Sequence, residues 1–159
     1  MKIGLDTSVL IASVKRRGEK HHEQALRLGK RIASENHEGV CSALILTELP
    51  GALASSTTMP VDKIYETELS VIAGFKISVR PFEQYSDTAV DLMLEFRELK
   101  RKFDIGSADF LHLATASGEG CAVFVTTDEK HLLRDECKRA FSSHIDVRSP
   151  GEAFETPSF

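Results

Sequence analysis

Four acidic residues, far apart along the 159-residue chain, have the types and positions to bind one metal ion together. Asp6 and Asp128 each close a short apolar run typical of a strand, and Glu48 and Asp109 lie in the opening turns of apolar helical segments. In an open α/β sheet such positions meet beyond the carboxyl ends of the strands. Clustered carboxylates repel one another unless a cation neutralises them. The set therefore predicts a divalent-cation site, which indicates phosphodiester hydrolysis.

Each acid also has a structural explanation when it is taken alone. Asp6 and Asp128 are suited to cap the helices that follow them, because Asp is favoured at N-caps. Glu48, on or beside the buried face of its helix, needs a partner such as an arginine or a backbone amide. Asp109 is stabilised by the dipole at the start of its helix. The shared placement of all four favours the metal site over four separate explanations.

The elements that must position these acids alternate along the chain, which favours a three-layer α/β/α fold whose parallel sheet is covered on both faces. The predicted strands are 2–5, 39–42, 75–79, 121–125 and 144–147. The predicted helices are 7–14, 22–34, 43–54, 61–73, a single long helix over 87–102, and 108–117. Ser42 and Ser107 are the expected N-caps of two of them, and Gly118 is the expected residue after the last. Thr126 and Glu129 fit a capping box for a further short helix.

The composition is that of a soluble globular protein. Hydrophobic residues make up 42% and charged residues 28%, and no apolar stretch approaches the roughly 20 residues of a membrane helix. The first residues become charged too early for a secretory signal, so we predict a cytoplasmic protein. The length suits one domain, expected over residues 1–154, with a frayed tail over 155–159.

The charge and the cysteines exclude two classes. With 20 Lys and Arg against 24 Asp and Glu the net charge is −4, which argues against a protein that coats nucleic acid electrostatically. Cys41, Cys121 and Cys137 are odd in number and show no CxxC spacing, so buried thiols are predicted rather than a disulfide framework or a zinc site.

Four segments carry a family resemblance: LDTSVLI at 5–11, the helix around Thr47 and Glu48, SADFLHLATA at 107–116, and VTTD at 125–128. In this order and approximate spacing they resemble the PIN-domain nucleases, and among them the VapC-type ribonuclease toxins of toxin–antitoxin pairs. The likeness runs from Lys2 to about Phe154. It implies a five-stranded parallel sheet of order 3-2-1-4-5.

The resemblance also implies roles for the acids. Asp6, Glu48, Asp109 and Asp128 match the family's catalytic, metal-binding positions, which hold Mg²⁺ or Mn²⁺. Asp6 and Asp109 are the main expected ligands, and Asp128 is expected at a second, weaker cation or a metal-bound water. Glu48 and Asp128 both remain candidates for the general base.

Supporting groups and partners follow from the same resemblance. The hydroxyls of Thr7 and Thr127 are expected to orient water or phosphate, and Ser8 stands where many relatives carry Asn. The expected reaction is cleavage of single-stranded or looped RNA by a metal-activated water, which leaves 5′-phosphate and 3′-hydroxyl ends. The expected partners are a small antitoxin protein, which covers an apolar groove near the early helices, and a second copy of the chain.

Several alternatives stay open. A non-catalytic PIN module that binds RNA or protein would keep the fold without the chemistry. A phosphotransferase of the haloacid-dehalogenase type also uses an Asp after its first strand, but resembles DxDx(T/V), and Ser8 occupies the place of its second Asp. His112 is expected to be a partly buried histidine satisfied by a neighbour rather than a ligand, and Asp104 to be solvated. The basic runs 15–17 and 100–102, and the Arg134, Lys138 and Arg139 group, either line an RNA groove or are solvated helix ends.

Overall fold

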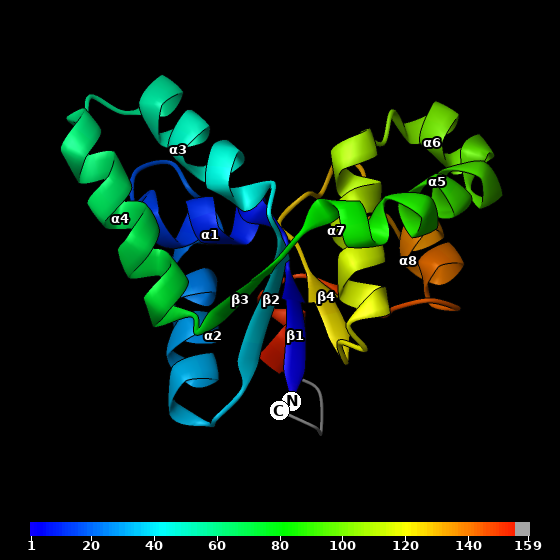
Figure 1. Cartoon of the computed structure of the whole chain (residues 1–159), viewed down its shortest axis with the longest axis horizontal. Helices are drawn as coiled ribbons and strands as arrows, with labels where there is room; N and C mark the ends of the chain where they lie inside the picture. Colours follow the sequence, from blue (N-terminus) through cyan, green and yellow to red (C-terminus); the bar gives the residue numbers. More distant parts are fainter. Residues whose placement is uncertain (155–159) are drawn as a thin grey trace.

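In the computed structural model, which describes residues 1–154, the chain forms one parallel five-stranded sheet between two groups of helices (Figure 1). The strands are β1 (Lys2–Leu5), β2 (Glu38–Ser42), β3 (Ile77–Arg80), β4 (Val123–Val125) and β5 (Val147–Arg148). Every neighbouring pair is parallel and the order is β3-β2-β1-β4-β5. The predicted α/β fold and its strand order are confirmed.

The helices divide between the two faces of the sheet. The α-helices are α1 (Thr7–Val14), α2 (His22–Ser34), α3 (Ile45–Ser56), α4 (Val61–Gly74), α5 (Ser86–Glu95), α6 (Arg97–Phe103), α7 (Ser107–Gly118) and α8 (Asp135–Phe141). Short 3₁₀ turns occupy η1 (Phe82–Tyr85) and η2 (Glu152–Phe154). Helices α1 to α4 pack in one hydrophobic cluster and α5, α7 and α8 in another, so the sheet separates two cores.

One glycine sets how closely α7 approaches the central strand. Ile3 and Leu5 of β1 point into the core of the first helix group, so Gly4 between them faces the other side. A Cβ added at Gly4 would lie 2.4 Å from the Cβ of Ala116 on α7. The missing side chain therefore lets α7 lie directly against β1, and the start of α7 comes close to the residue that follows β1.

The long helix predicted over 87–102 is wrong, because the chain breaks into α5 and α6 at Phe96. The ring of Phe96 packs edge-on against Phe141, with ring centroids 5.0 Å apart, and against His144 at 5.6 Å. These partners lie about 45 residues further along the chain. The apolar period of the segment is helical throughout, so this break depends on tertiary contacts that the local pattern does not contain.

Three predicted helix boundaries are also wrong. Ser42 is not an N-cap: it ends β2, fully buried, and α3 begins only at Ile45. Ser107 is the first residue of α7, and the N-cap is Gly106, whose N–H donates to the Asp109 carboxylate. Gly118 is the last residue of α7 rather than the residue after it, and a Cβ added there would meet the Tyr85 ring at 2.6 Å. Its role is therefore packing against that ring.

The capping box at Thr126 and Glu129 does not form. The segment after β4 runs as turns, and the next helix, α8, starts at Asp135. The Thr126 side chain is fully buried and its hydroxyl donates to Asp6 at 2.6 Å, so it is committed to a tertiary contact. No helix within residues 1–154 has the length and apolarity to cross a membrane. The expected tail at 155–159 lies outside the described residues.

Candidate metal and active site

The acidic crevice, by which we mean the surroundings of Asp6, Glu48, Asp109 and Asp128, lies at the carboxyl ends of the central strands. Asp6 directly follows β1, and its N–H donates to the Val125 carbonyl at the end of β4. Asp128 follows the same end of β4, while Glu48 and Asp109 stand in the first turns of α3 and α7. The structure thus brings four segments from across the sequence to one edge of the sheet, as parallel topology requires.

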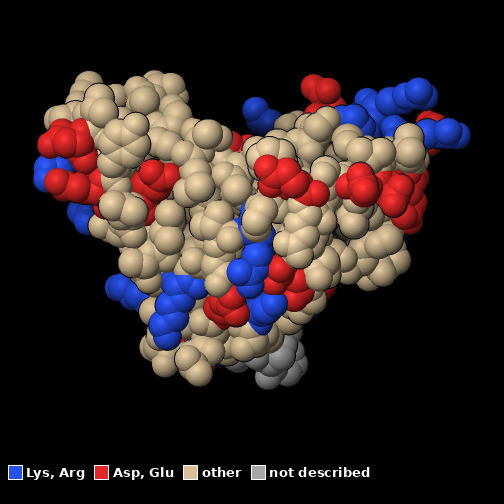
Figure 2. Space-filling model, viewed as in Figure 1, with Lys and Arg blue, Asp and Glu red and all other residues tan. Residues whose placement is uncertain are grey.

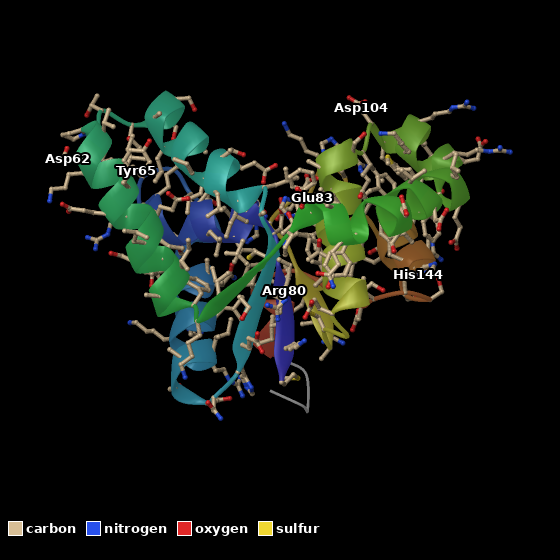
Figure 3. The ribbon with its side chains drawn as sticks, in the orientation of Figure 1. Asp62, Tyr65, Arg80, Glu83, Asp104 and His144 are labelled. Atoms are coloured by element: carbon tan, nitrogen blue, oxygen red, sulfur yellow. The ribbon has the colours of Figure 1, made fainter. Side chains whose placement is uncertain are left out.

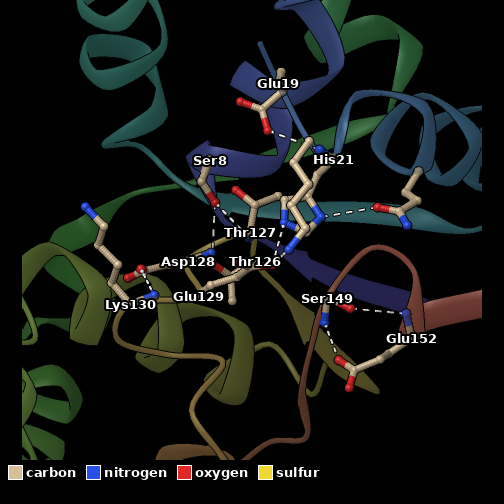
Figure 4. Close-up of polar contacts among 12 residues, drawn as sticks. Ser8, Glu19, His21, Thr126, Thr127, Asp128, Glu129, Lys130, Ser149 and Glu152 are labelled. Atoms are coloured by element: carbon tan, nitrogen blue, oxygen red, sulfur yellow. Dashed lines mark hydrogen bonds and ion pairs between the residues drawn. The ribbon is translucent and has the colours of Figure 1, made fainter.

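Asp6 is held by hydroxyls rather than by a cap. It occupies the N-cap position of α1, but its carboxylate makes no capping hydrogen bond. Its Oδ2 accepts the hydroxyls of Ser8 and Thr126, each at 2.6 Å, and the side chain is almost fully buried. Ser8 also accepts the N–H of Thr127 at 3.0 Å, which ties α1 to the loop after β4 (Figure 4). The capping explanation therefore does not account for the carboxylate of Asp6.

Asp128, by contrast, forms its hydrogen bonds within its own loop. Its Oδ1 accepts the N–H groups of Lys130 and His131, and its Oδ2 contacts His131 Nδ1 at 2.7 Å. Its own N–H donates to the Thr126 hydroxyl at 3.1 Å (Figure 4). This carboxylate stabilises the turn in which it lies and has a histidine as partner. The structural explanation accounts for these contacts of Asp128.

Glu48 belongs to a series of hydrogen-bonded side chains that joins four elements, α1, α3, α7 and β2. Its Oε2 accepts the Thr7 hydroxyl from α1 and contacts His112 Nε2 on α7 at 2.9 Å. The other ring nitrogen of His112 lies 3.0 Å from the Ser42 hydroxyl at the end of β2. The hydrogen bond from His112, assisted by that from Thr7, lowers the pKa of Glu48 below its ordinary value.

His112 is buried and has two partners, as expected for a histidine satisfied by its neighbours. Burial alone would lower its pKa, but the hydrogen bond to Glu48 and the charges of Asp6, Glu48 and Asp109 together raise it. When this ring is protonated, it compensates the charge of Glu48. Glu48 is thus an acid of the crevice whose partner is a histidine rather than a lysine or an arginine.

Asp109 has the opposite environment. Its Oδ2 accepts the Gly106 N–H at 2.8 Å, and it stands at the amino end of α7, where the helix dipole favours a negative charge. Nevertheless its pKa is raised, first by burial and then by the negative charge of Asp6, with a smaller effect of Asp128. Two stabilising contacts are therefore outweighed by the neighbouring acids and by loss of solvent.

The donor set suits a hard divalent cation. Within residues 1–154 no Lys or Arg forms an ion pair with Asp6 or Asp109, and each of these carboxylates keeps one oxygen that accepts no hydrogen bond there. As the side chains stand, no three His, Cys, Asp or Glu residues of this described part are close enough to hold a metal ion. Oxygen contacts of about 2.0–2.6 Å would require the carboxylates to turn toward a common point.

The two predicted supporting threonines differ. The Thr7 hydroxyl donates to Glu48, so in this arrangement it orients that carboxylate. Thr127 contributes its backbone N–H to Ser8, and its partly exposed side chain makes no hydrogen bond within the described chain. Sequence reasoning did not identify Thr126 and Ser42 as crevice residues. Both are hydroxyl residues at the ends of central strands, and that position is the signal that points to them.

Asp104 and the basic run 100–102 form no hydrogen bond or ion pair with the crevice carboxylates within the described chain. Asp104 is exposed and has a left-handed backbone conformation directly after α6 (Figure 3), which agrees with the solvated position expected for it. In the basic run 100–102, Lys100 donates to the Ile105 carbonyl and Lys102 pairs with Glu136 at 2.6 Å. These two cations therefore already have partners in the protein.

The family model described as PIN domain matches residues 3–135 of the chain. Among solved structures, the chain is similar to VapBC2 from Rickettsia felis bound to a DNA fragment from its promoter, with a TM-score of 0.62 and 14% identity over 94% of this chain and 98% of that one. It is also similar to FitAB bound to IR36 DNA, with a TM-score of 0.58 and 17% identity over 94% and 95% of the two chains. No curated protein matches significantly. At these identities the structural likeness concerns the fold.

Proposed function

Because the chain belongs to the PIN domain family, we propose that it is a divalent-metal-dependent endoribonuclease that acts as the toxin of a toxin–antitoxin pair. One observation carries the catalytic part of the proposal. Asp6 and Asp109 come from elements about 100 residues apart, yet both lie at the same edge of the sheet, where burial and then the charge of Asp6 raise the pKa of Asp109, and neither forms an ion pair with a Lys or Arg of the described chain. Buried or partly buried carboxylates without a compensating positive charge are costly unless they bind a cation.

In the proposed mechanism Asp6 and Asp109 hold Mg²⁺ or Mn²⁺. When bound, the cation lowers the pKa of a water molecule and stabilises negative charge on the phosphoryl oxygens. Ser8 and Thr126 fix the orientation of Asp6 through their hydroxyls. These two hydroxyls leave the second oxygen of Asp6 available to the ion.

Glu48 and Asp128 complete the proposed site in different ways. Glu48, held by Thr7 and His112, stays ionised because its pKa is low, so it accepts a proton poorly and suits a role in charge and positioning. Asp128 is partly exposed and paired with His131, and we assign it to the water shell or to a second, weaker cation. Thr127, with its free hydroxyl, remains the proposed contact to water or phosphate.

An antitoxin and a second copy of the chain are the proposed partners. The structural relatives VapBC2 and FitAB support a paired protein, since both are complexes of two named components. A groove of about 460 Å³ between α1, α2 and α4 has a mainly apolar lining that includes Val14, Leu26 and Phe75, and we propose it for an antitoxin segment. For the homodimer, light scattering of the purified chain at micromolar concentration gives the test. A monomeric mass across the concentration range would refute it.

A non-catalytic PIN module that binds RNA or protein is the second candidate. The observation that favours it is the spacing of the acids, since no three potential ligands of the described chain lie within metal-holding distance as they stand. Under this alternative the carboxylates stay apart when Mn²⁺ is added. Cation binding therefore separates the two candidates before any cleavage is measured.

The decisive experiment measures both properties on the same proteins. We expect Mn²⁺-dependent cleavage of single-stranded RNA by the wild type and its loss in Asp6→Asn and in Asp109→Asn. Asp87→Asn, which removes a charge from the exposed start of α5, serves as the matched control and keeps full activity. Millimolar Mn²⁺ should also raise the melting temperature of the wild type, because a ligand that binds only the native state stabilises it. Equal cleavage by all four proteins would reveal a contaminant and sink the catalytic proposal.

A further inference from the structure

A second groove of the molecule carries positive rather than negative charge. It has a volume of about 740 Å³ and lies between the segment after α1 and the segment that joins α3 to α4. One wall is the basic run Lys15, Arg16 and Arg17, and the other is the hydroxyl-rich run 55–58. No acidic residue of the described chain lines it. We call it the basic groove, and we infer that it binds the phosphate backbone of single-stranded RNA.

The cations of the basic groove are available to a ligand. Arg16 and Arg17 are exposed, and within residues 1–154 neither forms an ion pair or hydrogen bond. Most other basic side chains of this described part have partners, as Lys102 does with Glu136 and Lys138 with Glu152. A short exposed loop with two adjacent unpaired guanidinium groups is suited to planar, bidentate contacts with phosphate.

An alternative role for these cations is to stabilise the end of α1, but this role explains only one of the three. Lys15 is the C-cap of α1, where a positive side chain complements the negative end of the helix dipole. Arg16 and Arg17 lie beyond that end, in a loop that continues to Gly18 with a positive φ. The inference therefore depends on the two arginines.

The position of the basic groove relates it to the acidic crevice. Helices α1 and α3 pack against each other and are joined at their starts by the hydrogen bond from Thr7 to Glu48. The basic groove lies at their other ends, about 10 Å further along each helix at 1.5 Å per residue. Thr58, on the hydroxyl wall, has no hydrogen bond within the described chain and adds a donor. A strand whose scissile phosphate lies in the crevice reaches this groove within a few nucleotides.

The basic groove would also explain how a protein with a negative net charge binds RNA. A chain with a charge of −4 repels a polyanion at long range, and the acidic crevice adds to that repulsion. Phosphate contacts supply most sequence-independent affinity for nucleic acid, so such contacts must come from a local cluster of cations. This inference rests on the proposed ribonuclease function, because it assigns the binding of that same substrate.

The test measures binding separately from cleavage. A short fluorescein-labelled single-stranded RNA of mixed sequence is titrated without divalent cation, and its anisotropy is followed at several salt concentrations. Wild type is compared with the double variant R16Q/R17Q and with the matched control K30Q/K76Q. The control removes the same charge from two exposed, unpaired lysines near the amino ends of the strands, and melting temperatures verify that all three proteins are folded.

We expect R16Q/R17Q to bind the RNA roughly tenfold more weakly at low salt, and its salt slope to fall by about 1.4, since each phosphate contact on a single strand contributes about 0.7. The control should change the affinity less than threefold. Equal weakening of both variants would mean general charge attraction and would overturn the inference, as would preferential binding of polyglutamate over RNA. If the wild type cleaves RNA and R16Q/R17Q binds it as tightly as the wild type does, the role of the basic groove is overturned and the ribonuclease proposal stands. If the wild type neither binds nor cleaves RNA, both proposals are overturned.

Discussion

The two ends of α7 hold carboxylates in opposite electrostatic environments. Asp109, in the first turn, has negative neighbours and no cationic partner in the described chain, and its pKa is raised. Glu119, just after the last turn, accepts from Lys2 Nζ at 2.6 Å, lies 2.9 Å from Arg80 Nε, and accepts the Tyr85 hydroxyl. These contacts lower the pKa of Glu119 to about 2.

The helix dipole predicts the reverse order, because it stabilises an anion at the start of a helix and destabilises one at the end. The local partners therefore decide both pKa values. Arg80 extends over the sheet (Figure 3), and in the same view positive and negative side chains alternate at that place on the surface (Figure 2). Charge is compensated at Glu119 and left uncompensated at Asp109, which is what a structural site and a cation site respectively require.

Removal of each charge gives the largest expected contrast. Asp109→Asn should lower the rate of RNA cleavage by about a thousandfold, because metal ligation and electrostatic stabilisation contribute effects of this order. Glu119→Gln should stay within about threefold of wild type when assayed well below its melting temperature. Single-turnover cleavage in Mn²⁺ measures both. A comparable loss in Glu119→Gln would mean that the two ends of α7 are not functionally distinct.

Stability should respond in the opposite way at Glu119. Glu119→Gln is expected to cost about 2 kcal/mol, or about 4–8 °C in melting temperature. The value is less than the full pKa shift implies, because Lys2 is 36% exposed and its contact is screened by solvent. As the folded pKa is depressed from 4.5 to about 2, this contribution is present above pH 4.5 and is lost as the pH falls toward 2. Urea unfolding of both proteins across this range provides the check.

Asp109 should behave as a group that reduces stability when no cation is present. We expect Asp109→Asn to raise the melting temperature by about 2–4 °C, about 1 kcal/mol, because the amide keeps the contact with Gly106 and removes the repulsion by Asp6. The ionised carboxylate is unfavourable above its ordinary pKa of 3.8, so the gain should be larger at pH 7 than near pH 4. Differential scanning fluorimetry without metal measures it. A variant that melts below the wild type at pH 7 contradicts the proposed repulsion.

Much of this arrangement is predictable because it follows from topology. Parallel strands bring their carboxyl ends to one edge, so acids after β1 and β4 and at the starts of α3 and α7 had to lie at the same edge of the sheet. The family resemblance added the strand order, which local periodicity does not contain. The proposal that Asp6 and Asp109 are the main ligands depended on position alone, and their lack of cationic partners supports it.

What the sequence does not reveal are contacts between side chains of distant segments. Ser42 has the local pattern of an N-cap, but its hydroxyl contacts His112, 70 residues away. Glu119 looks like a solvated acid after a helix, and its partners Lys2 and Arg80 are 117 and 39 residues away. Propensity and periodicity describe neighbours within a few residues. They therefore predict the pKa of an acid only from its position in a helix, and they miss the distant partner that determines its charge state.

Glu48 is intermediate between Asp109 and Glu119, because its partner is a histidine that can be neutral or charged. Removal of that partner has the smallest expected effect on stability. The His112→Gln variant keeps a neutral N–H donor for Glu48 and removes only the option of a positive charge. The raised pKa of His112 adds stability that is present below its unfolded value of 6.5 and is lost as the pH rises through the folded value. The lowered pKa of Glu48 adds stability that is present above 4.5.

The ion pair therefore contributes most between about pH 4.5 and 6.5, by about 1 kcal/mol or less. The difference in melting temperature between wild type and His112→Gln should be a few degrees larger at pH 5.5 than at pH 9. Since a change of packing alone gives the same difference at every pH, a flat profile would show that His112 acts on Glu48 as a neutral hydrogen-bond donor. Glu48 would then join Asp6 and Asp109 as an uncompensated acid, and all three carboxylates would contribute negative charge for a cation to neutralise.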